Sequence, residues 1–301
     1  MSSLMLIPNI KIHNANALSS PYTIGFPAMT AWLGGVHALQ RKLNVSEYPD
    51  LKFTRVGVAC QAIDLQTHKG QGDYIASIIG TGNPLTKTGS RPSFIEEARC
   101  HLTVSLIIEY EDLEDEDSLE SETDPIAEIT RQLHRLKFAG GDILEFETPE
   151  LHSDNEDKDY RKLIRKLMPA YLLIERRDLM IQAMQAQEQP DAISALLDYL
   201  TVKNRSEMIA HEHKGDEIKW TATRKTSGWI VPIATGFQGI SELGIAKNQR
   251  DVDTPHRFAE SLLTLGEFKM AYQFKTLDDM LWSYHADIEN DLYLCQQNSN
   301  I

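Results

Sequence analysis

The order in which apolar periodicity changes along the first half of the chain constrains its fold most strongly. In the first strand, Leu6, Ile10 and Ile12 fall on one face and Asn9, Lys11 and His13 on the other, and residues 52–65 and 99–110 alternate likewise. Alternation with a period of two is typical of a strand that buries one face. Between the first two runs, residues 27–43 begin with a proline and place apolar side chains three and four positions apart, which predicts a helix. The chain therefore begins as strand, helix, strand and strand.

A second helix and a fourth strand complete this series. Asp124 and Pro125 form a favourable helix start, and an apolar stripe follows them. Gly140 and Gly141 should end the helix, after which residues 143–147 return as a strand. The order is βαββαβ, which predicts an α+β, ferredoxin-like core whose helices cover one face of an antiparallel sheet. We place this domain at residues 1–148.

The other face of the predicted sheet is expected to be open and polar. It would display the side chains of Asn9, Lys11, His13, Arg55, Gln61, Arg99, His101 and Thr103. A sheet that reads single-stranded RNA normally adds stacked aromatic residues here, and only Phe53 is a candidate. Pro8 also lies inside a strand that this fold places centrally, where proline is unfavourable. The alternation alone does not support a conventional single-strand reader.

The loop between the first strand and the first helix is rich in small polar residues. Asn14, Asn16, Ser19 and Ser20 precede a helix N-terminus, where backbone N–H groups favour an anion such as phosphate. A simple helix-capping loop is the alternative.

Glycine pairs mark two positions of close approach. Gly34 and Gly35 lie inside the predicted helix, where together they cost about 2 kcal/mol relative to alanine. We expect close packing of the helix on the sheet at this point. Gly140 and Gly141 cap a helix, and their N–H groups are also available to a phosphate.

A long insertion separates the second and third strands. Residues 68–97 exceed a hairpin turn and predict a projecting β-arm, with Lys87 and Arg91 at a basic tip. Such an arm can contact phosphates or wedge between bases. A surface loop without function is the alternative.

The negative charge of the chain is local. The net charge is −14, but residues 109–159 hold 19 acidic residues against four basic ones, and the remainder is nearly neutral. The acidic loop at 110–124 cannot bury apolar area, which predicts a solvated segment. It would otherwise be a docking strip for a basic partner.

Residues 149–301 differ in composition from the first half and predict a helical and mixed extension. Residues 159–187 are helical in period and rich in cations, with Pro169 dividing them into two helices. A third helix should follow Pro190, and residues 256–265 also look helical. The cations form either a solvated helix face or a surface for nucleic acid or an acidic protein.

The sequence offers little support for catalysis. It contains no GxxxxGK[ST], GxGxxG, HExxH or GxSxG motif, so no cofactor is expected. His211 and His213 flank Glu212 without a second ligand pair, which argues against a metal site. His37 or His134 could act as a general base in RNA cleavage, although partly buried structural histidines are the simpler interpretation.

The compartment is expected to be the cytoplasm. Three cysteines without a CxxC spacing indicate neither a disulfide framework nor zinc, and the apolar start is broken by Pro8 and Lys11. No apolar run is long enough to cross a membrane.

Three segments carry a family resemblance: NANALSSPYTIGFPAMTAWLGGVHALQRKL, NPLTKTGSRPSFIEEARCHLTVSLI and RDVDTPHRFAESLLTLGEF. The chain resembles the second subunit of the type I-F CRISPR surveillance (Csy, Cascade-type) complex from Ile7 to about Tyr284. The resemblance implies a RAMP-type (RRM-like) ferredoxin-like core, a thumb formed by the arm from Gly70 to Pro92, and a glycine-rich loop at residues 138–141.

The resemblance also implies a function and partners. The subunit would pair with the large Csy subunit, hold the 5′ handle of CRISPR RNA and cap one end of a complex that targets foreign DNA. Backbone Csy subunits, target DNA through the complex and anti-CRISPR proteins would be further partners. The family is similar to a structural cap without catalysis. Two alternatives stay open: a metal-independent RAMP endoribonuclease and a protein-only interaction module.

The residues expected to contact RNA form three groups. The loop would contribute backbone contacts from Asn14, Asn16, Ser19 and Ser20. Basic contacts would come from Arg55, Lys87, Arg91 and Arg99, and from Arg250, His256 and Arg257 in the third quoted segment.

Overall fold

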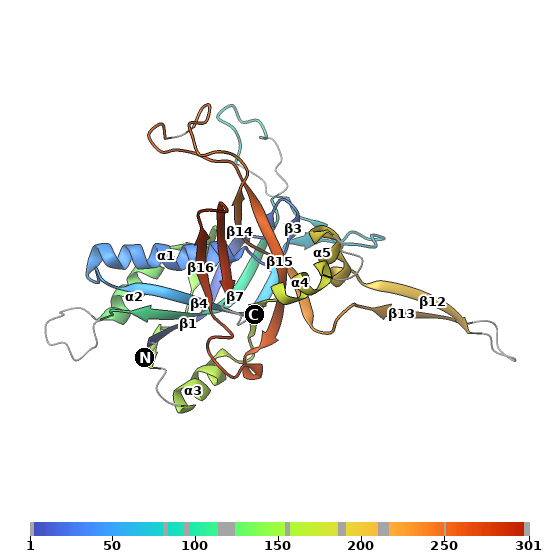
Figure 1. Cartoon of the computed structure of the whole chain (residues 1–301), viewed down its shortest axis with the longest axis horizontal. Coiled ribbons are helices and arrows are strands. Elements are labelled where there is room, and N and C mark those ends of the chain that lie inside the picture. The colour runs from blue at the N-terminus through green and yellow to red at the C-terminus, as the bar shows by residue number, and fades with distance from the viewer. Residues whose placement is uncertain are drawn as a thin grey trace.

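A computed structural model describes residues 3–80, 84–92, 97–113, 124–153, 157–185, 191–209, 217–249 and 251–297 (Figure 1). Most of the strand residues belong to one large antiparallel sheet, and helices pack against it. Most of the predicted acidic loop, residues 114–123, lies outside the described residues. No helix in the described ranges combines the length and apolarity needed to span a membrane.

Four long or central strands organise the N-terminal half. β1 (Ser3–Asn16) lies between β7 (Arg99–Glu111) and β9 (Gly141–Glu145), and β4 (Lys52–Leu65) pairs with the other side of β7. The chain order is β1, α1 (Met29–Ser46), β4, β7, α2 (Pro125–Leu133) and β9. Shorter strands are β2 (Leu18–Ser20), β3 (Thr23–Ile24), β5 (Thr67–His68), β6 (Ser77–Ile78), β8 (Lys137–Phe138) and β10 (Glu150–Ser153). The helices predicted after Pro27 and after Asp124 are confirmed.

The two helices begin with the local features that the sequence indicated, but α2 ends at Leu133 and not at the glycine pair 140–141, which lies at the turn between β8 and β9. The Asp124 side chain accepts a hydrogen bond of 2.9 Å from the backbone N–H of Ile126 and so caps α2, whose first residue is Pro125. One face of α1 is buried, with the side chains of Met29, Trp32, Leu33, Val36, Leu39 and Leu43. This face packs on the main core, where the Trp32 ring lies 6.1 Å from the Phe138 ring.

The close packing expected of the glycine pair is found at Gly35, where α1 approaches β8, and not at Gly34. A Cβ atom on Gly35 would lie 2.5 Å from Cδ1 of Phe138, whose side chain is fully buried. Replacing Gly35 by alanine is therefore expected to lower the free energy of unfolding by about 1–3 kcal/mol, as overpacking does. Gly34 is the matched control, because a Cβ there has no atom within 4 Å. Gly34→Ala should raise stability by up to about 1 kcal/mol. Urea unfolding of both variants would contradict the close approach if the two changes were alike.

An irregularity in β1 accommodates Pro8. The register between β1 and β7 shifts at this point, and Asn9 has a φ of 50° while its N–H donates to the Ser105 hydroxyl at 3.0 Å. On the other side, β10 pairs with residues 3–6 and β9 with residues 11–13. Pro8 therefore lies opposite the gap between two partner strands, where a missing N–H costs no ladder bond.

The prediction of an open second face is wrong for part of the sheet. Helix α3 (Asp157–Leu167) and residues 271–281 cover it, and they form a second core with apolar residues of β1, β4 and β7. Leu6, Ala59 and Ile107 are the strand residues at its centre, each at most 1% exposed. Continuous apolar runs such as residues 4–7 are typical of strands buried on both faces. Lys11, His13 and His101 remain at least partly exposed on the uncovered part.

The C-terminal region continues the same sheet. Its strands are β11 (Tyr171–Glu175), β14 (Trp229–Gly239), β15 (Ala259–Met270), β16 (Trp282–Asp287) and β17 (Leu292–Gln297). A 3₁₀ turn, η1 (Ala271–Gln273), follows β15. The pairings run β11, β15, β14, β17, β16 and β4, and β11 also pairs with β4. These pairings form a closed ring of strands. β4 belongs both to this ring and to the N-terminal part of the sheet.

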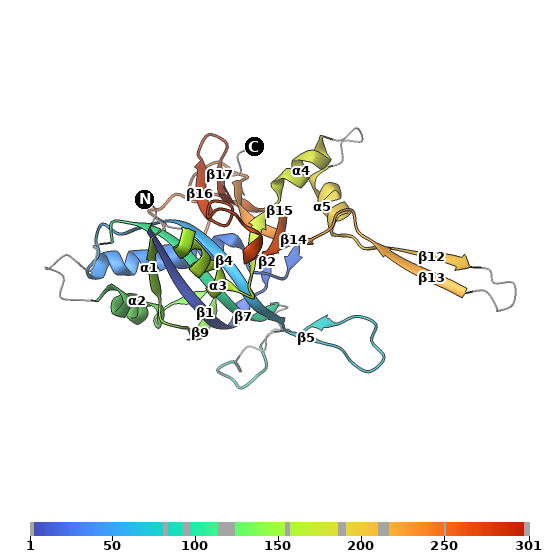
Figure 2. The same cartoon turned by 90° about the horizontal axis from the view of Figure 1, so that it is seen from below.

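Two predictions for the C-terminal region are wrong. The residues around Pro169 form not two helices but α3, then strand β11, then α4 (Arg177–Met184). Residues 259–265 belong to strand β15 and not to a helix. The helix predicted after Pro190 is confirmed as α5 (Ala192–Leu200). It leads into a separate two-stranded ribbon, β12 (Lys203–Ile209) and β13 (Glu217–Thr223), which projects from the body in both views (Figures 1 and 2).

Candidate nucleic-acid interface

Three segments meet at the end of the sheet where β1 finishes and β7 begins. Asn16 is the register partner of Arg99, and the Asn16 N–H donates to the carbonyl of Ala139 at 2.8 Å. Asn14 has a φ of 56°, and its carbonyl accepts a hydrogen bond from Arg99. Arg99 also forms an ion pair with Glu97. The structure thus brings together Asn14, Asn16, Arg99 and the turn between β8 and β9.

Two histidines stack beside these residues. The rings of His13 and His101 lie 4.3 Å apart with an interplanar angle of 12°, and Nδ1 of His101 accepts a hydrogen bond of 3.1 Å from the Asn14 N–H. His13 is also the register partner of Asp142. A flat pair of aromatic rings at a sheet surface can stack on a nucleobase. The sequence placed both histidines on the polar face but gave no signal that they stack, since their contact depends on the register of β1 and β7.

The turn between β8 and β9 has the backbone geometry of an anion site. Ala139 and Gly140 both have positive φ, at 48° and 74°, and Gly140 is exposed. Successive N–H groups in such a turn can converge on a phosphate. Gly141 has a different role, because a Cβ there would lie 2.8 Å from the Ala15 backbone nitrogen. Lys137 binds Asp142 across this turn at 2.6 Å and keeps the pKa of that carboxyl below its usual value.

Ser19 and Ser20 serve the loop itself. Their hydroxyls lie 2.8 Å and 2.7 Å from the Thr23 hydroxyl, and Ser20 is only 5% exposed. These contacts hold the hairpin of β2 and β3 together. Asn16 also contributes locally, because its side chain both donates to the Leu18 carbonyl and accepts from the Leu18 N–H, at 3.1 Å in each case. The structure therefore assigns the two serine hydroxyls to hairpin packing.

The basic tip of the arm is exposed. Lys87 lies in a turn in which the N–H of Gly89 donates to the Thr86 carbonyl at 2.9 Å, and Arg91 follows this turn. Among the described residues, no carboxylate oxygen lies within 4.0 Å of either cation. The arm leaves β4 after Leu65 and returns at β7, so its base lies at the same end of the sheet as Asn16.

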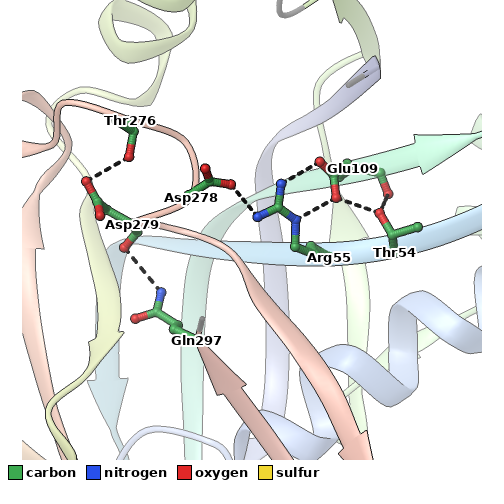
Figure 3. A network of polar contacts seen from close by, with 7 residues as sticks. All are labelled: Thr54, Arg55, Glu109, Thr276, Asp278, Asp279 and Gln297. Carbon is green, nitrogen blue, oxygen red and sulfur yellow. Dashed lines mark hydrogen bonds and ion pairs between the residues drawn. The ribbon is translucent and has the colours of Figure 1, made fainter. Parts of the chain in front are cut away.

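Arg55 lies far from this group. It is the register partner of Glu109, ten residues along β7 from Arg99, or about 33 Å at the usual rise. Its guanidinium holds Glu109 with two bonds of 2.6 Å and also pairs with Asp278 (Figure 3). The hydrogen bonds to Glu109 raise the pKa of Arg55. This charge is already matched inside the protein.

The third predicted group consists of Arg250, His256 and Arg257, of which His256 and Arg257 lie among the described residues. Arg250 lies outside the described residues. Arg257 forms an ion pair with Asp291, and its side chain is 26% exposed. His256 forms a β-bridge with Gly244, and its ring lies 2.6 Å from the Thr254 carbonyl. The segment from residue 240 to 258 extends beyond the sheet on the same side as the arm residues 84–92, at the top of Figure 1.

No catalytic or metal arrangement forms around the candidate histidines in the part of the chain that the structure describes. His37 and His134 are both exposed, so the interpretation as partly buried residues is wrong. The His134 ring lies 4.9 Å from the Phe146 ring. Within those ranges no three His, Cys, Asp or Glu residues are placed to hold a metal ion. His211, Glu212 and His213 lie outside them.

Comparison with known proteins agrees with the resemblance in the sequence. The family model described as CRISPR-associated protein (Cas_Csy2) matches residues 5–295. A curated relative, the CRISPR-associated protein Csy2 of Pseudomonas aeruginosa (strain UCBPP-PA14), is 33% identical over 316 aligned positions, which cover 97% of this chain and 94% of the relative. The match is long enough to include both the candidate interface and the C-terminal strands. The chain therefore belongs to the Csy2 family of CRISPR-associated proteins.

Proposed function

We propose that the chain is a non-catalytic subunit of a type I-F Csy complex that binds the 5′ handle of CRISPR RNA together with the large Csy subunit. Membership of the Csy2 family over residues 5–295 supports a place in this complex. In this role the subunit caps one end of the assembly, and it meets backbone subunits, target DNA and anti-CRISPR proteins only as part of it. The cytoplasm is the compartment in which such a complex acts.

The proposal includes a ferredoxin-like core with the arm as its thumb. The strand order β4, β7, β1, β9 and the helices α1 and α2 on one face support it. The glycine turn at residues 139–141 then lies at the start of the last strand of the core, with Gly140 exposed and the Ala139 carbonyl bonded to the Asn16 N–H.

The observation that carries RNA binding is the position of the arm. Its base lies beside Asn16, Arg99 and the stacked histidines, and its tip presents Lys87 and Arg91 without internal carboxylate partners in the described ranges. Phosphates bound by such cations release counterions, so the affinity depends on salt. The backbone turn and the histidine rings can take one phosphate and one base, while the arm contacts the neighbouring backbone.

Replacing Lys87 and Arg91 together by alanine tests this assignment. In the assembled complex with its large-subunit partner, the variant should bind handle RNA more weakly. The slope of log affinity against log salt should also fall by about 1.4, since each phosphate contact to a single strand contributes about 0.7. A salt titration by gel shift measures both effects.

The matched control removes the same charge from the helices that cover the other face. Arg41 and Arg135 are exposed on α1 and directly after α2. Replacing both by alanine should leave the slope unchanged. If the arm variant kept the wild-type slope of log affinity against log salt, the arm would not be part of the RNA interface.

A further inference from the structure

The projecting ribbon of β12 and β13 carries an apolar surface that the body of the protein does not cover. Met208, Ile218 and Trp220 are 72%, 60% and 69% exposed. In both views the ribbon extends away from the sheet and the helices (Figures 1 and 2). A two-stranded ribbon has no core of its own and is only marginally stable in water.

The register of the ribbon places these three side chains on one face. Met208 pairs with Ile218, Ser206 with Trp220, and Asn204 with Ala222. Directly opposed residues of an antiparallel pair point to the same side, and alternate residues share a face. This face, which we call the uncharged ribbon face, consists of Asn204, Ser206, Met208, Ile218, Trp220 and Ala222.

The described charges of the ribbon lie on its other face. Lys203, Arg205, Glu207 and Lys219 alternate with the residues of the uncharged ribbon face. A nucleic acid bound against Trp220 would bring phosphates to a surface without cations, although such binding depends on cations beside the stacking ring. The segregation of charge favours an apolar protein surface as the occupant.

The base of the ribbon contacts α5 through ion pairs. Asp198 binds Lys203 at 2.9 Å and Lys225 at 2.7 Å, so it ties both ends of the ribbon to one helix. The Lys225 ammonium also lies 4.3 Å from the centre of the Tyr199 ring, and Tyr199 is buried. These contacts connect both strands of the ribbon to α5 at its base.

We infer that the uncharged ribbon face docks into an apolar groove on another protein subunit of the assembly, with Trp220 as its central side chain. This inference rests on the proposed place of the chain in a Csy complex. Exposed tryptophans that become buried at an interface commonly dominate its affinity. The charged face of the ribbon stays in solvent when the other face is covered.

The test compares neighbouring residues that point to opposite sides of one strand. Trp220→Asp places a charge on the uncharged ribbon face, and Thr221→Asp places the same charge on the other face at a position that is also exposed. Each variant is produced with the other Csy subunits and CRISPR RNA, and subunit recovery is measured by native mass spectrometry across a dilution series. Trp220→Asp should weaken association at least about tenfold, and Thr221→Asp should leave it unchanged. Thermal unfolding of each free chain should match the wild type, because the ribbon lies outside the three apolar cores.

Cross-linking identifies the occupant directly. A p-benzoylphenylalanine in place of Ser206 lies opposite Trp220 and leaves that ring intact. A cross-link to another protein subunit supports the inference, while a cross-link to RNA or to a second copy of this chain overturns it. Equal recovery of the two aspartate variants also overturns it and leaves the proposed function standing. If the wild-type chain assembled with none of the other Csy subunits, that result would contradict both the inference and the proposed function.

Discussion

Replacing Trp282 by alanine is expected to lower the free energy of unfolding by about 3–5 kcal/mol, the usual cost of emptying a buried aromatic site. Trp282 is fully buried and pairs with Val56, where β16 meets β4. Its Nε1–H donates to the Leu173 carbonyl of β11 at 2.9 Å. One side chain thus links three strands of the ring of pairings, and its loss also leaves a buried carbonyl without this donor.

Two controls separate packing from the hydrogen bond and from tryptophan in general. Trp282→Phe keeps most of the ring volume and loses the donor, so it should cost about 1–3 kcal/mol. Trp220→Ala removes an exposed ring and should change stability by less than about 0.5 kcal/mol. Urea unfolding of the three variants gives the comparison. A Trp282→Ala protein as stable as Trp220→Ala would contradict the role of Trp282 in closing the ring.

Removing the carboxylate of Glu109 should have an effect of similar size. Glu109 is 8% exposed and accepts from Arg55 through both oxygens, and from the Thr54 hydroxyl at 2.6 Å (Figure 3). Breaking a buried pair typically costs about 3–5 kcal/mol. Arg55 keeps its ion pair with Asp278 when Glu109 is removed, so Glu109→Ala should destabilise the protein by up to that amount in chemical unfolding.

Asp278 offers a control on the same arginine. It binds the other side of the Arg55 guanidinium, but its side chain is 69% exposed. An exposed ion pair contributes about 0–1 kcal/mol, so Asp278→Ala should be nearly neutral. If the two carboxylates proved equally important, burial would not determine the strength of this network.

The sequence predicted the elements whose periodicity is unambiguous. Residues 99–110 alternate cleanly and form β7, and the helix starts at Pro27 and Asp124 depend on local chemistry that a sequence displays. Prediction from the sequence failed where an apolar run is short. The run YLLIE at residues 171–175 forms a strand, but five apolar or mixed positions cannot distinguish a strand from a helix turn.

The second face of the sheet was mispredicted for a related reason. Residues 4–7 at the start of β1 are apolar without alternation, and they lie between two cores. The residues that cover their second face lie far along the chain, at 157–167 and 271–281. Periodicity within one segment says which face is apolar, but it cannot identify a covering segment far along the chain.

The candidate site was predictable by residue type and not by grouping. Lys87 and Arg91 could be proposed from the sequence because a turn-rich basic segment is a local feature. Arg55 has the same charge, but its partner Glu109 is 54 residues away, so its neutralisation was invisible in the sequence. The stacking of His13 on His101 likewise depends on strand register.

We propose that this chain holds the 5′ handle of CRISPR RNA with a partner and without cutting it. The most direct measurement is a gel assay of 5′-labelled CRISPR RNA with the chain alone and with the large Csy subunit, in chelator, with native and denaturing lanes side by side. We predict a native shift that requires the partner, and intact RNA in the denaturing lane. A shortened RNA, or no shift with the partner present, would contradict this account.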